Sequence, residues 1–116
     1  MIRVMLCQAL LLFAGCALVR DDASGGTYRH RFAQPPQRAA ACFARNAEEH
    51  SSALAAEVRA PDARGRVEVI VRVKNGYSYA NASIQPAGAG SDGTITLMVV
   101  SSGGGGELVR ELTAGC

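Results

Sequence analysis

The sequence contains no tryptophan, and only three tyrosines and three phenylalanines occur among its 116 residues. Aromatic side chains bury a large area each, so their scarcity excludes a core built around big rings. The core must instead come from valine, isoleucine, leucine and alanine, which bury less surface per residue. A chain of this length holds a single small domain. We therefore expect a thin core that needs an added constraint for its stability.

Neither sign of charge predominates in this sequence. The 12 basic residues nearly balance 10 acidic ones, which leaves a formal net charge of +2. A protein that holds nucleic acid by neutralising phosphates needs a clustered excess of basic side chains, and this composition does not supply one. We expect no nucleic-acid partner.

Motifs that carry chemistry are also missing. His30 and His50 are the two histidines, and neither lies at a spacing typical of metal ligands. Ser101 and Ser102 lack the Gly-x-Ser-x-Gly frame of a serine nucleophile. The glycine-rich segments lack the context of phosphate-binding loops. We therefore expect no metal, no cofactor and no catalytic residue, and thus a protein that is not an enzyme.

No apolar run is long enough to span a bilayer as a permanent helix. The run from Val4 to Ala14 is interrupted by Gln8 and follows the positive charge of Arg3. This pattern is typical of a signal peptide. We expect residues 1–15 to be removed on export, so that the domain folds outside the cytoplasm.

The end of this segment, Phe13-Ala14-Gly15-Cys16, resembles the lipobox of bacterial lipoproteins. The resemblance implies that Cys16 is diacylated on sulfur, with palmitate among the chains, and acylated on its new amino group after cleavage. Three acyl chains would hold the protein at a membrane almost permanently, at about 0.8 kcal/mol for each buried methylene. Phe13 departs from the leucine that is usual there, and ordinary secretion with cleavage after Ala17 is the alternative.

The residue after the candidate lipidated cysteine is Ala17 rather than aspartate. By resemblance to the sorting rule of enteric bacteria, this implies an outer-membrane lipoprotein that faces the periplasm. A soluble periplasmic or secreted protein is the alternative location.

Residues 16–34 are predicted to be the lipidated cysteine and a flexible tether. The segment has no sustained helical periodicity, and residues 21–26 are rich in aspartate, serine and glycine. Within it, Thr27 to Ala33 alternates, with Tyr28, His30 and Phe32 on one side. An edge strand is therefore the alternative for this stretch.

The domain itself, residues 35–116, is predicted to begin with a long helix. Pro35-Pro36 opens a run rich in helix formers, from Gln37 to Ala60, which stops before Pro61. At about 100° per residue, one stripe of this helix is apolar. The stripe consists of Ala40, Phe43, Ala47, Leu54 and Val58.

A β-hairpin is predicted next. Valines at 67, 69, 71 and 73 alternate with other residues, and Asn75-Gly76 follows, which is the strongest short signal for a two-residue turn. If Lys74 pairs with Tyr77, every inward valine meets a small or apolar partner, from Val73 opposite Ser78 to Val67 opposite Ile84. The opposite face then pairs Arg72 with Tyr79.

The remaining chain is predicted to complete the sheet and cover it. Residues 86–93 are expected to turn, residues 94–100 to form a third strand, and residues 107–114 to form a short helix after a glycine run. The predicted fold is α+β, with the long N-terminal helix packed on a three-stranded antiparallel meander and a short C-terminal helix.

The cysteines supply the expected constraint. Once Cys7 leaves with the leader and Cys16 carries lipid, Cys42 and Cys116 remain as a pair in an oxidising compartment. A disulfide between them is the expected state. The alternative, a reactive Cys42, lacks a base, because His50 lies eight residues further along the predicted helix, about 12 Å away by helical rise.

The outward face of the meander is a candidate interaction surface, since aromatic residues, methionine and arginine are enriched at interfaces. Its residues are Ile70, Arg72, Tyr77, Tyr79, Met98 and Val100. The leading hypothesis is a small lipid-anchored cell-envelope protein with a non-enzymatic protein-interaction or structural role and an envelope protein as its partner. The alternatives are a periplasmic binder of a small apolar or cell-wall ligand, and a hydrolase. A contiguous apolar patch on the sheet would favour the first, and a closed cavity between helix and sheet the second.

Overall fold

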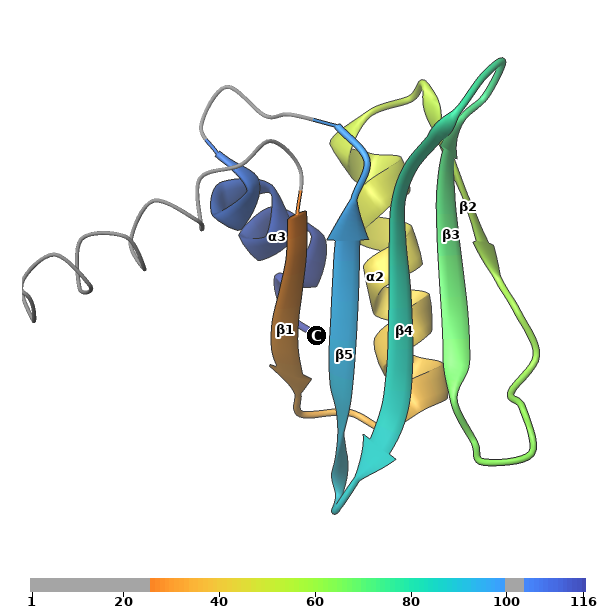
Figure 1. Cartoon of the computed structure of the whole chain (residues 1–116), viewed down its shortest axis with the longest axis vertical. Helices are drawn as coiled ribbons and strands as arrows, with labels where there is room; N and C mark the ends of the chain where they lie inside the picture. The colour runs from red at the N-terminus through yellow and green to blue at the C-terminus, as the bar shows by residue number, and fades with distance from the viewer. Residues whose placement is uncertain (1–25, 100–103) are drawn as a thin grey trace, which may run out of the picture.

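The computed structural model describes residues 26–99 and 104–116. The predicted signal peptide, Cys16, the first part of the predicted tether and Val100 lie outside these residues. The described chain forms a five-stranded antiparallel sheet in the order β1-β5-β4-β3-β2, together with helices α2 and α3 (Figure 1). The elements are β1 Gly26–Phe32, α2 Pro36–His50, β2 Leu54–Val58, β3 Val67–Val73, β4 Ser78–Ala87, β5 Gly90–Leu97 and α3 Gly105–Thr113.

The sheet has one covered face and one open face. Strands β1 and β2 lie at opposite edges, and α2, which connects them in the chain, crosses behind the sheet (Figure 1). Helix α3 lies on the same side, next to α2 and β1 (Figure 1). The other face of the sheet is turned toward the viewer.

The core lies between α2 and the sheet. Small residues of α2 allow the helix to approach the strands closely, and the alternating valines of β3 meet alanine and isoleucine on β4. Few of the core side chains are large. Phe32 and Phe43 are the bulkiest of those that are fully buried. The fully buried members are Phe32, Ala39, Ala40, Phe43, Ala47, Val67, Val69, Val71, Ala80, Ile84, Ile95 and Leu112.

The predicted long N-terminal helix is wrong. Helix α2 ends at His50, Ser51 has an extended backbone, and its hydroxyl accepts a hydrogen bond from the backbone N–H of Ala53. The following residues, Leu54–Val58, form β2 and pair with β3. Buried and more exposed side chains alternate at the start of this segment. As a strand, the segment buries Leu54 and forms hydrogen bonds with the backbone of β3 on the side away from β4. Pairing with a distant strand therefore overrides a local preference for helix.

The predicted three-stranded meander is also wrong, because the sheet has five strands. Residues 26–32, assigned to the tether with an edge strand as the alternative, form β1 and pair with β5. Phe32 is fully buried, and its ring lies directly over Gly93, where any side chain would overlap it. The Ser91 hydroxyl donates to the carbonyl of Gln34 at 2.5 Å. These contacts join the start of the described chain to the sheet.

The predicted hairpin register is confirmed from Val67 opposite Ile84 to Val71 opposite Ala80. It shifts at Arg72, which pairs with Ser78, so that Tyr79 is the extra residue of a β-bulge. The predicted two-residue turn is wrong as well. A type I′ turn needs two positive φ angles, whereas neither Asn75 nor Gly76 has one. The turn instead closes with the Gly76 N–H donating to the Val73 carbonyl at 3.0 Å.

The next connection is shorter than predicted. Strand β4 runs to Ala87 and β5 begins at Gly90, so most of the expected turn over residues 86–93 is strand. Gly88 has a φ of +59°, a conformation that glycine adopts without steric cost. This tight turn keeps β4 and β5 paired from Ala80 opposite Leu97 to Ala87 opposite Gly90.

Candidate functional site

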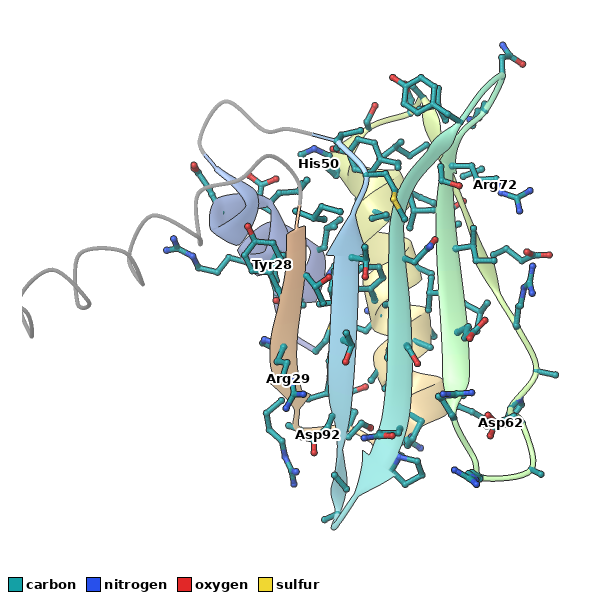
Figure 2. All side chains as sticks on the ribbon, viewed as in Figure 1. Tyr28, Arg29, His50, Asp62, Arg72 and Asp92 are labelled. Carbon is teal, nitrogen blue, oxygen red and sulfur yellow. A yellow bond between two sulfur atoms is a disulfide. The ribbon has the colours of Figure 1, made fainter. Side chains whose placement is uncertain are left out.

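The open face of the sheet is built from alternate residues of the five strands, which line up in rows across it (Figure 2). Hydroxyl and amide side chains predominate in the middle of these rows, and charged groups lie at three of their four ends. One row contains Thr27, Thr96, Asn81, Ile70 and Glu57, and the next contains Arg29, Thr94, Ser83 and Glu68. The face is therefore mostly polar.

The predicted interaction surface is only partly assembled. Ile70 is half-buried and Arg72 is exposed on β3, and Met98, just after β5, is 50% exposed. Tyr77 is 69% exposed, but it lies beside the turn between β3 and β4. Arg72 extends from the upper part of β3 in Figure 2. The described part of the face thus carries scattered apolar groups among polar ones, and not the contiguous apolar patch that would have favoured protein contact by hydrophobic burial.

Tyr79 is withdrawn from this surface. It is partly buried against the hydrophobic core, and burial, followed by the charge of Glu111 on α3, raises the pKa of its phenol. Both observations place the ring on the covered side of the sheet. The cause is the bulge at Arg72 and Ser78, which interrupts the regular alternation of β4.

Two adjoining hollows lie on the open face and meet at Thr94. The first, of about 180 Å³, is lined by side chains of Glu68, Ile70, Asn81, Ser83, Thr94 and Thr96. The second, of about 340 Å³, includes Arg29, Arg31, Gln85, Asp92 and Thr94. We call the two together the trough. It extends across four strands, from β3 to β1.

Some charged side chains of the trough are paired within the domain, and others are not. Arg31 donates to the Asp92 carboxylate at 3.2 Å and to the Ala87 carbonyl at 2.9 Å, which ties β1 to the turn between β4 and β5. Within residues 26–99 and 104–116, no hydrogen bond or ion pair engages the side chains of Arg29 or Glu68. Arg29 and Asp92 are seen on this face in Figure 2. Two opposite charges at the ends of one row are therefore available to a partner.

Asn81 is the unusual residue of the trough. Its Oδ1 atom is buried, and no donor among the described residues reaches it. Leaving a buried acceptor unpaired costs about 1–3 kcal/mol. Because this oxygen is buried, a donor from outside the domain cannot reach it while the surrounding side chains stay in place.

The cysteine pair lies on the covered side, away from the trough. Cys42 and Cys116, the two predicted partners, form a disulfide. Asn46, one turn after Cys42, donates to the carbonyls of Leu112 at 3.0 Å and Ala114 at 2.9 Å. Asn46 thereby caps the end of α3. This role of Asn46 was not predicted from the sequence, where the only local signal is its position four residues after Cys42.

The histidines also serve the fold. His50 Nδ1 lies 2.7 Å from a carboxylate oxygen of Glu111, which joins the end of α2 to α3. The His30 ring meets the Phe32 ring edge-on, with centroids 4.7 Å apart. Within the described ranges, no three histidine, cysteine or carboxylate side chains are grouped to hold a metal ion.

Asp62 organises the loop between β2 and β3. Its carboxylate accepts hydrogen bonds from the backbone N–H groups of Arg64 at 2.8 Å and Arg66 at 3.0 Å. These bonds lower the pKa of Asp62 below its ordinary value, and the bond from Arg66 has the larger effect. The carboxylate has a structural role at the end of the sheet.

Comparison with known proteins gives no assignment. No protein-family model, no curated protein and no solved structure matches this chain. Among the residues that the structure describes, no helix has the length and apolar character to cross a membrane.

Proposed function

We propose that this chain is a small lipid-anchored protein of the cell envelope that acts through non-enzymatic protein contacts, made by the open face of its sheet. The observation that carries the proposal is the one-sided architecture. Helices α2 and α3 cover one face, while no described element packs on the other (Figure 1). On that face Arg29, Arg72 and Glu68 are exposed and have no described side-chain partner. Arginine and methionine are enriched at protein interfaces.

The covered side supports this choice over an apolar ligand between helix and sheet. Phe32, Phe43, Ile84 and Ile95 are fully buried there and fill the space that such a ligand would need. The hollows described above lie on the open face instead. The open face is also too polar for an apolar ligand, because its central positions are threonine, serine and asparagine.

The proposed anchor is Cys16. The nine residues 17–25 separate it from β1, and fully extended they reach at most about 30 Å. A partner at or near the membrane would therefore lie within reach of the open face. The anchor gives the domain its location and leaves the sheet free for contact.

The anchor is tested by changing Cys16 to serine. A thioether to lipid needs the sulfur atom, so we expect Cys16→Ser to abolish metabolic labelling with a radioactive fatty acid and to prevent the shift to the mature mass. Cys7→Ser is the matched control, since Cys7 would leave with the leader, and it should be labelled like the wild type. Undiminished labelling of Cys16→Ser would exclude the anchor.

The contact surface is tested by site-specific photo-crosslinking in intact cells. A photoreactive amino acid at Thr94, in the middle of the open face, should capture an envelope protein, whereas the same group at Glu49, exposed on α2, should not. Arg72→Glu should lower the yield of the Thr94 adduct, and Arg45→Glu on α2 should leave it unchanged. Equal adducts from both faces, or adducts from α2 alone, would contradict the proposal.

A further inference from the structure

We infer that the trough binds an extended peptide segment that carries a carboxylate and a positive charge about four residues apart. This inference rests on the proposed function in using the same face of the sheet. It adds what that face recognises in its partner.

The spacing of the charges sets the length of the ligand. Arg29 on β1 and Glu68 on β3 lie in one row, separated by Thr94 on β5 and Ser83 on β4. Three inter-strand spacings amount to about 14 Å. A fully extended peptide of four residues spans about 13–14 Å. Four residues therefore bridge the guanidinium at one end and the carboxylate at the other.

The floor of the trough suits a peptide backbone. Thr94 and Ser83 have small side chains, so a ligand can approach the sheet closely, and their hydroxyls both donate and accept hydrogen bonds. A peptide backbone that crosses the trough over Thr94 and Ser83 can therefore exchange hydrogen bonds with both hydroxyls.

Other ligand classes match less of the trough. A polyanion would pair with Arg29 but meet repulsion from Glu68, and a simple cation would leave Arg29 unpaired. An uncharged sugar or an apolar ligand would leave both charges without a partner. An extended zwitterionic segment pairs with both charges at once.

The test uses tetra-alanine with free amino and carboxyl ends, titrated into the purified isotope-labelled protein and followed by NMR. We expect saturable shifts of the backbone amides of Asn81, Ser83 and Thr94. Tetra-alanine with an acetylated amino end and an amidated carboxyl end should bind at least tenfold more weakly. Dialanine, which has the same charges but half the length, should also lose at least tenfold.

Variants of the protein test the same two charges from the other side. Arg29→Gln and Glu68→Gln should each lower the affinity for free tetra-alanine about tenfold, while Arg45→Gln and Glu49→Gln on α2 should have no effect. In the double variant Arg29→Glu with Glu68→Arg, the affinity should return, because the peptide can lie in the reverse direction. The four positions are exposed, so the NMR spectrum should remain that of a folded domain.

Two results would overturn the inference. One is equal affinity for the free and capped tetrapeptides, which requires no variant of the protein. The other is the absence of shifts in the trough at millimolar peptide. Neither result would affect the proposed protein contact, which the crosslinking from Thr94 tests separately. Conversely, if the peptide binds but no partner is crosslinked from Thr94, the proposed protein contact is refuted.

Discussion

Breaking the Cys42–Cys116 disulfide should lower the free energy of unfolding by about 4–5 kcal/mol. The bond joins residues 74 positions apart, and in the chain-entropy model a crosslink over so long a loop lowers the entropy of the unfolded chain by this amount. Small domains have a net stability of about 5–15 kcal/mol, so this loss would be a large part of the total. We expect the double variant Cys42→Ala with Cys116→Ala to be partly unfolded at 37 °C.

The measurement is urea denaturation followed by circular dichroism without reductant. Wild-type protein with added reductant is the matched control, and it should unfold at nearly the same urea concentration as the double variant. Each single variant should resemble the double variant, because either one breaks the bond. A loss below about 1 kcal/mol would mean that the Asn46 hydrogen bonds and core packing hold α3 in place without the disulfide.

Replacing Phe32 by alanine should destabilise the domain by about 3–5 kcal/mol. Its ring is fully buried against Gly93, and alanine would leave a cavity in a core that has few large side chains. Arg29→Ala, on the exposed side of the same strand, should change the stability by less than about 0.5 kcal/mol. Urea denaturation measures both variants.

A double-mutant cycle tests the packing of Phe32 on Gly93 directly. Gly93→Ala should be destabilising in the wild-type background, since the new methyl group would overlap the ring. In the Phe32→Ala background the same change should cost less, because the space is empty. If residues 26–32 behaved as a tether, Phe32→Ala would leave the stability unchanged and the two substitutions would show no coupling.

The hairpin shows where sequence patterns suffice. The register of β3 against β4 follows from matching valines to small and apolar partners, and five consecutive pairs of the ladder agree with that prediction, from Val67 opposite Ile84 to Val71 opposite Ala80. A one-residue slip would turn every valine outward, so the pattern alone excludes it. The bulge at Arg72 was not predictable, because Tyr79 gains burial only once α3 and the core lie beside it.

The errors at β1 and β2 share one physical cause. Helix propensity is a property of neighbouring residues, and by that measure the segment 54–58 could continue α2. Its strand conformation depends on the free edge of β3, which a local window does not contain. Strand β1 was missed for the same reason. The alternation of residues 27–33 was visible in the sequence, but Gly93, on which the Phe32 ring packs, lies 61 positions further along the chain.

The candidate site was the least predictable part. Ile70 and Arg72 were assigned to the open face, but Arg29 joins their sheet only through β1 and β5, and the rows across the face depend on the strand order. The unpaired oxygen of Asn81 is likewise a result of packing. The choice of Tyr77 and Tyr79 as contact residues assumed a regular hairpin, which the bulge and the turn do not provide.

Patterns among neighbouring residues were enough to predict the valine ladder and its register and the start of α2 at the paired prolines, and the small number of cysteines was enough to predict the pairing of Cys42 with Cys116. The tertiary structure alone decided how far α2 extends, that two edge strands complete the sheet, and which side chains meet on its open face. The reason is that these features depend on contacts between segments far apart in the chain. The free backbone groups at the edge of a strand pair with whichever segment the fold brings beside them, and the space beside a glycine is filled in the same way.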